Sequence, residues 1–160
     1  MKKKGFTIVE LLLYMGLLTV FTVIMTHMFT SILDVQLESV ATGAVSEDSR
    51  YLYGRLTYDI KRAASIVTPP VVGETTDSLT IMIGTVANTY RMSGDAIVLV
   101  NDAGVNRLNG SATRISGLSF QRLGKAEGKN SIRIAFTIDS TTQKVSGPET
   151  KTVTTTVALR

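Results

Sequence analysis

Glu10 is an acidic residue in a place where a charge is costly. It lies four residues after Phe6 and directly before an apolar run, Leu11–Leu33, of 23 residues without Asp, Glu, Lys or Arg. A lone charge deep in a bilayer costs about 2.5–3.5 kcal/mol, and less near the interface. A charge in this place is unusual for an ordinary membrane anchor. From its position alone, Glu10 is either a solvated interfacial acid without a partner or a residue with a role in the function of the segment.

The sequence offers few residues for catalysis or metal binding. The chain has no cysteine, which excludes disulfides, thiolate metal sites and thiol nucleophiles. Its single histidine, His27, lies inside the apolar run. Intramembrane ionisable groups are candidates for proton relays, but we favour a neutral imidazole hydrogen-bonded within a helix bundle. No nucleophile–base pair is recognisable, so neither an enzyme nor a cofactor or metal site is predicted.

The apolar run is long enough to cross a membrane as a helix. At about 1.5 Å per residue it spans about 34 Å, against about 30 Å for a hydrocarbon core. Lys2, Lys3 and Lys4 precede it, and Asp34 follows it. The positive-inside rule therefore predicts a single-pass inner-membrane protein with a cytoplasmic N-terminus and its C-terminal domain outside. The run is too long for the core of a conventional signal peptide, about 7–15 residues.

The helix pattern continues well beyond Leu33. Apolar residues recur in steps of three and four as far as Ile66, and Pro69-Pro70 then stops a helix. We expect one helix over residues 6–66, about 90 Å long, with an amphipathic second part over 34–68. Most charges of this part are expected on its other faces: Asp34, Glu38, Glu47, Arg50, Arg55, Asp59 and Arg62.

Beyond Pro69-Pro70 the apolar residues recur at every second position, which predicts strands. Ile132, Ile134, Phe136 and Ile138 alternate with polar residues, so their strand should have one buried face. Short turn signals separate the runs and predict an antiparallel meander over 69–160, packed on the helix in an α+β fold. The expected strands are Leu79–Ile83, Thr89–Ser93, Ile97–Asn101, Arg114–Arg122, Ile132–Asp139 and Thr150–Leu159.

The segment Gly5-Phe6-Thr7-Ile8-Val9-Glu10-Leu11-Leu12 resembles the class III signal of type IV pilins and of type II secretion pseudopilins. The resemblance implies that residues 1–5 are a leader, which a prepilin peptidase removes between Gly5 and Phe6 before it N-methylates Phe6. Residues 6–33 would then enter a filament core. In the family the acid equivalent to Glu10 pairs with the N-terminal amine of a neighbouring subunit. Without the leader the net charge falls from +4 to +1, because 14 basic side chains then face 13 acidic ones.

A looser resemblance extends into the second part of the helix. The pattern Arg50-x-Leu52-x-x-Arg55-Leu56-x-x-Asp59-Ile60-x-Arg62-Ala63 is similar to minor pseudopilins of the J type. The chain departs from many major pilins in having His27 in place of a kinking proline and in lacking cysteines for a C-terminal disulfide. The resemblance implies a minor subunit that primes, tips or modulates a filament. Its partners would be the peptidase, other pilin or pseudopilin subunits, an inner-membrane assembly platform and membrane lipid.

The alternative function is a membrane-anchored ligand-binding module, an adhesin or a DNA-uptake pilin. Its candidate basic surface is Arg122, Lys125 and Lys129, extended by Arg107 and Arg114. We favour scattered solvated charges over a DNA-binding strip, because the mature charge is nearly balanced.

Three further motifs have two interpretations each. Residues 124–129 contain glycines and lysines, but their context favours a hairpin over a phosphate loop. Asn109-Gly110-Ser111 is a glycosylation acceptor in form, and we prefer a tight turn. Gly16, with Thr19 and Thr22, either permits close helix contact or is merely tolerated, and the sequence leaves these two open.

Overall fold

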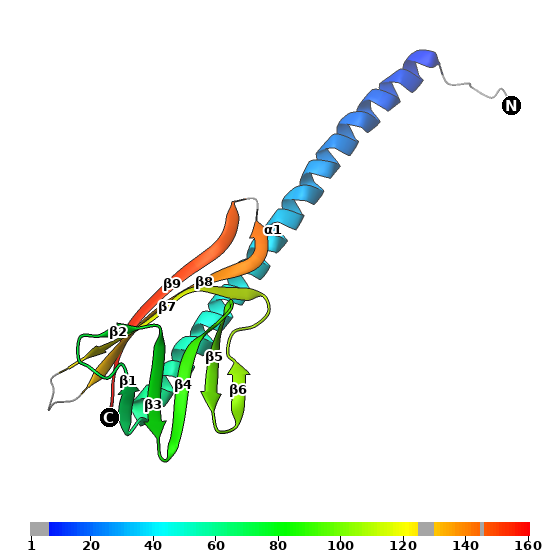
Figure 1. The fold of residues 1–160 in the computed structure, drawn as a ribbon. Coiled ribbons are helices and arrows are strands. Elements are labelled where there is room, and N and C mark those ends of the chain that lie inside the picture. The colour runs from blue at the N-terminus through cyan, green and yellow to red at the C-terminus, as the bar shows by residue number, and fades with distance from the viewer. Residues whose placement is uncertain (1–6, 125–129, 145) are drawn as a thin grey trace. The chain divides into compact units, whose positions relative to one another are not determined.

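The computed structural model describes residues 7–124, 130–144 and 146–160. They divide into two compact units, one ending at Leu37 and the other comprising Glu38–Arg160. Several predicted site residues lie outside the described residues: Lys2, Lys3, Lys4, Gly5, Phe6, Lys125 and Lys129. The predicted α+β fold is confirmed, with one long helix and two antiparallel sheets (Figure 1).

Helix α1 runs from Ile8 to Arg62 and is 55 residues long. Thr7 caps its start, since its Oγ1 accepts a hydrogen bond from the amide of Glu10 (3.3 Å). Within the second unit one face is buried, and its members recur in steps of three and four as predicted. They are Ala41, Val45, Ser49, Leu52, Leu56, Asp59 and Ile60.

The predicted end of the helix is wrong. α1 stops at Arg62, and strand β1 (Ser65–Thr68) takes the residues that were expected to continue it. The amide of Ala64 donates to the carbonyl of Met82 (2.8 Å), and β1 then pairs with β3 (Ser78–Ile83). The β-branched residues Ile66 and Val67 suit this pairing, so sheet contacts override the helical period before the prolines are reached.

The strands form two sheets rather than the single meander that was expected. The first has the order β1-β3-β4-β5-β6, and the second has the order β2-β7-β8-β9, with all neighbours antiparallel. All six predicted strands are present with shifted bounds, while β1, β2 and β6 were not foreseen. The remaining strands are β2 (Thr75–Thr76), β4 (Val86–Ser93), β5 (Ala96–Asn101), β6 (Gly104–Arg107), β7 (Thr113–Leu123), β8 (Ser131–Lys144) and β9 (Gly147–Ala158).

Tight turns join neighbouring strands at two of the predicted turn signals. Ser93 pairs with Ala96 across a two-residue loop, and Asn101 pairs with Gly104 across another. Gly94 has φ +62°, a conformation that glycine adopts without steric cost and that the first position of such a loop requires.

The core lies between the second part of α1 and the two sheets (Figure 1). Leu52, Leu56 and Ile60 of the helix meet residues of both sheets in one cluster, including Tyr90 of β4 and Phe120 of β7. The predicted alternation in β8 is confirmed, because its four apolar residues from Ile132 to Ile138 are all at most 2% exposed. This core holds the second unit together without disulfides.

Candidate functional site

The first unit is an apolar helix with no buried side on the described chain. Every residue from Thr7 to Leu37 is exposed except Glu10, which is half-buried. The exposed fractions of the large apolar side chains here run from 42% at Leu33 to 80% at Ile8. This part of α1 is long and apolar enough to cross a membrane, and no charged side chain interrupts it from Leu11 to Leu33.

Glu10 lies in the first turn of α1, where the helix dipole favours a negative charge. The hydroxyl of Tyr14, one turn further on, donates to its Oε1 at 3.5 Å, which is a long hydrogen bond. Among the described residues no cation forms an ion pair with this carboxylate. The structure therefore leaves the carboxylate with capacity for a cation from outside the described chain.

The threonine hydroxyls further along the apolar helix are satisfied locally. Thr19 and Thr22 donate to the carbonyls of Met15 (2.8 Å) and Leu18 (2.9 Å). Thr30 donates to the carbonyl of His27 at 3.0 Å, while the His27 imidazole is exposed. A Cβ added at Gly16 would meet nothing within 4 Å. These hydroxyls can lie in an apolar medium without a partner from another helix, because each is paired within its own turn.

The candidate basic surface is divided by the fold. Arg114 and Arg122 lie near opposite ends of β7, about 26 Å apart at about 3.3 Å per residue. Arg107 and Arg114 both face Asp95, with nitrogen–oxygen distances of 3.7 and 3.9 Å. No continuous basic strip joins the three described arginines of the predicted surface.

Arg122 has a structural position instead. Its guanidinium donates to the carbonyls of Pro69 (3.2 Å) and Pro70 (2.8 Å), and its Nε donates to Oδ1 of Asn130 (3.4 Å). The side chain therefore holds the segment after β1 against β7. Its donors are largely used by these oxygens, which leaves few for a phosphate.

Two of the motif interpretations are decided by position. Most of the 124–129 motif lies outside the described residues, but β7 and β8 on either side of it are antiparallel neighbours, as a hairpin requires, and the next described element is a strand, where a phosphate loop needs a helix. Asn109 is only 4% exposed; its Oδ1 accepts from the amide of Ile97 (3.2 Å) and its Nδ2 donates to the carbonyl of Thr113 (3.0 Å). It is therefore no accessible glycosylation acceptor. The chain bends at Asn109 and turns at Ser111-Ala112, so the predicted turn lies slightly later than expected, in the segment that passes from the first sheet to the second.

A buried polar cluster on α1 was missed by the sequence reasoning. Asp59, whose side chain is 5% exposed, accepts from Nε of Arg55 (2.8 Å) and from the hydroxyl of the fully buried Tyr90. Burial raises the pKa of Tyr90, and the hydrogen bond and charge of Asp59 raise it further. Burial lowers the pKa of Arg55, but Asp59 and Tyr90 more than offset this, so the net shift is upward. The expectation that Asp59 lies off the buried face is wrong; its spacing of three and four from Leu56 and Arg55 was the available signal.

A second carboxylate, Asp48, ties the helix to the crossover between the sheets. Its Oδ2 accepts from the amide of Gly110 (2.9 Å) and from the hydroxyl of Thr113. The segment before β7 is thereby fixed against α1. No pattern in the sequence pairs residues so far apart.

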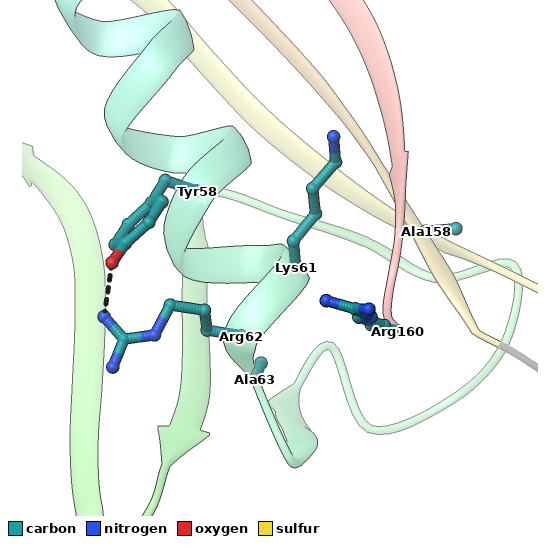
Figure 2. Close-up of a pocket in the computed structure, with 6 residues that line it drawn as sticks. All are labelled: Tyr58, Lys61, Arg62, Ala63, Ala158 and Arg160. Carbon is teal, nitrogen blue, oxygen red and sulfur yellow. Dashed lines mark hydrogen bonds between the residues drawn. The ribbon is translucent and has the colours of Figure 1, made fainter.

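A cleft of about 830 Å³ lies beside the end of α1 (Figure 2). It is lined by Tyr58, Lys61, Arg62, Ala63, Ala158 and Arg160. Arg62 donates to the Tyr58 hydroxyl (2.8 Å), and its guanidinium carbon lies 5.0 Å from the centre of that ring. The cleft is cationic, because three of its six lining side chains are basic and none is acidic. The described residues contain no group of three His, Cys, Asp or Glu side chains that could hold a metal ion.

Comparison of this chain with family models, with curated proteins and with solved structures finds no match. Two features of the structure bear on function: the apolar helix that carries Glu10, and the domain built on the second part of that helix.

Proposed function

We propose that this chain is a minor pilin or pseudopilin, a structural subunit of a type IV pilus-like or type II secretion filament. This proposal rests above all on Glu10: one half-buried carboxylate at the start of a helix whose apolar side chains are exposed on every side. The resemblance of residues 5–12 to the class III signal supports a role for this carboxylate in filament assembly. Such a subunit is a substrate of the prepilin peptidase and not an enzyme.

The proposed mechanism is a transfer of the apolar helix from lipid into a helical bundle. Both environments are apolar, so the helix gains packing rather than burial on assembly. Glu10 then provides the directional contact, a pair with the N-terminal amine of a neighbouring subunit. A misregistered helix would leave that carboxylate unpaired in an apolar medium at a cost of several kcal/mol. The pair therefore selects the axial position at which the subunit enters.

The proposed orientation in the membrane is set by the positive charge of Lys2, Lys3 and Lys4. The N-terminus would be cytoplasmic and the domain from Glu38 onwards would be outside, until the peptidase releases residues 1–5. The filament would then carry that domain on its surface, in contact with sibling subunits.

Leader processing is tested by mass spectrometry of the mature N-terminus, in cells that contain a prepilin peptidase. We expect a chain that begins with N-methylated Phe6. A Gly5→Leu variant should remain an uncut, membrane-held precursor, whereas Gly16→Leu, the same change within the apolar helix, should be cut normally. Normal cleavage of Gly5→Leu would contradict the leader assignment.

The assembly role is tested with Glu10→Ala in a strain that forms the filament. We expect normal processing and a reduction of at least about tenfold in the amount recovered with sheared filaments, because the charge pair is lost. Glu38→Ala removes an acid outside the charge-free run and should assemble normally. Equal recovery of the Glu10→Ala and wild-type chains would contradict the proposed mechanism.

A further inference from the structure

Two hollows lie along α1 and strand β9 in the second unit. The first is the cleft of Figure 2, which Lys61 of the helix and Ala158 of β9 both line. The second has a volume of about 220 Å³ and is lined by Ser49, Arg50, Tyr53, Lys151 and Val153. Lys151 of β9 donates to the Ser49 hydroxyl there (3.0 Å), so the strand runs along the side of the helix. We call this strip the α1–β9 groove.

One wall of the groove is an unpaired sheet edge. β9 is the last strand of its sheet and pairs only with β8. Among the described residues no backbone hydrogen bond joins β9 to any other element. The strand is 12 residues long and rich in threonine and valine, which favour extended backbone. A long edge of this kind is a template on which another strand can add through main-chain hydrogen bonds.

The other property of the groove is its charge. Arg50 and Lys61 of the helix, Lys151 within β9 and Arg160 just beyond its end line the two hollows. No aspartate or glutamate lines either hollow, and none of these four cations forms an ion pair within the described chain. Four unpaired cations beside a free edge give a surface complementary to an extended, acidic chain.

We infer that the α1–β9 groove binds an extended acidic segment of a partner protein, which adds as a strand along β9 while its carboxylates meet the four cations. A single-stranded nucleic acid would satisfy the cations but would leave the β9 main chain unpaired, so the edge favours a polypeptide. This inference goes beyond the filament role and does not depend on it, since it concerns only residues of the second unit.

The test uses the full-length chain in neutral detergent micelles and a fluorescein-labelled ten-residue peptide of alternating aspartate and valine. Fluorescence anisotropy should show saturable binding. Combining Lys61→Glu with Lys151→Glu should weaken it at least about tenfold. Combining Arg91→Glu with Arg133→Glu makes the same charge change at exposed arginines outside the groove and should leave the affinity unchanged. Circular dichroism melting of each variant checks that the domain is folded.

A second peptide separates strand addition from simple charge attraction. It has the same sequence and charge, with N-methyl groups on alternate amides, so it cannot donate to the β9 edge. We expect its binding to be at least about tenfold weaker, and the unmodified peptide to slow hydrogen exchange of β9 amides. Four results would overturn the inference: no binding, equal binding by the N-methylated peptide, unchanged binding by the folded groove variant, or equally tight, competing binding of a thymidine oligonucleotide of the same charge.

Discussion

The two parts of helix α1 have the same backbone but opposite surroundings. From Ile8 to Leu37 the apolar side chains are exposed all round, whereas from Glu38 to Arg62 one face is buried in the domain. Leu18 is 63% exposed and Leu56 is fully buried, although both are leucines on a single helix. The comparison shows that apolar composition and burial are separate properties. The second part packs within its own domain, whereas the first part has no buried side among the described residues.

The two parts of α1 also differ in the free energy of side-chain burial. Fully burying a leucine-sized side chain is worth about 1.5–3 kcal/mol relative to leaving it in water. The first part of α1 exposes more than a dozen such side chains within the described chain, so in water it would be strongly unfavourable. The second part gains that energy in its own core. Matched substitutions in the two parts therefore test the comparison directly.

The largest effect is expected from removing core volume in the second part. Leu56→Ala should lower the free energy of unfolding of the domain by about 2–5 kcal/mol, because it loses burial and leaves a cavity. Leu18→Ala makes the same change in the first part and should leave the domain's stability unchanged. Chemical denaturation of the full-length chain in micelles, followed by near-ultraviolet circular dichroism, measures both. Similar losses from the two variants would contradict the separation of the parts.

The charges of the two parts should differ in the same way. Asp59→Ala leaves the buried Tyr90 hydroxyl without its acceptor and should cost about 1–3 kcal/mol of domain stability. Asp34→Ala removes an exposed acid from the same helix and should cost nothing measurable. The same denaturation experiment compares them, and a stability loss confined to Asp34→Ala would reverse the assignment.

A pH dependence follows from Tyr90. Its pKa is raised in the folded state by burial and by Asp59, so the folded domain holds the phenolic proton more tightly than the unfolded chain. The contribution is fully present below the ordinary tyrosine pKa of about 10 and is lost above it, by about 1.4 kcal/mol per pH unit. Denaturation between pH 8 and pH 11 should show this decline, and Tyr90→Phe should flatten it. Tyr14→Phe, in the first part, should keep the wild-type slope; a flattened slope there would contradict the role of Tyr90.

The smallest effect is expected at the crossover that Asp48 holds. Thr113→Val removes one buried hydroxyl that donates to this carboxylate and should cost about 0.5–1.5 kcal/mol. Thr26→Val removes a hydroxyl that bonds only within the apolar helix, to the carbonyl of Thr22 (2.9 Å), and should leave the domain unchanged. Thermal melting of both variants is sensitive enough to separate these outcomes, and equal melting temperatures would remove Asp48 from the contacts that stabilise the domain.

None of the three strands that were not predicted shows a strand period in its sequence. All four residues of β6 are exposed, so it has no apolar alternation to detect, and β2 has only two residues. β1 carries apolar residues that continue the helical period, and only pairing with β3 decides its conformation. Strands and helices with one buried face were predictable, because a buried face requires apolar residues at a regular spacing in the sequence.

Some residues of the candidate site could be predicted from the sequence, and others could not. Glu10 and the charge-free run could be read directly, because an acid beside 23 uncharged residues is unusual wherever the chain folds. The burial of Asp59 could not, because an acid at a helical position is ordinarily solvated until a partner such as Tyr90 is placed against it. The α1–β9 groove was equally invisible, since its cations lie about a hundred residues apart in the chain.

The sequence alone determined the long helix, its apolar first part, the position of Glu10 and the strands with one buried face. These properties depend on spacing along the chain, which side-chain periodicity records. Only the tertiary structure decided where the helix ends, that the strands form two sheets, and which charges are buried, paired or left facing a groove. Those properties depend on contacts between residues distant in sequence, and the free energy of such contacts exceeds local preference wherever the two compete.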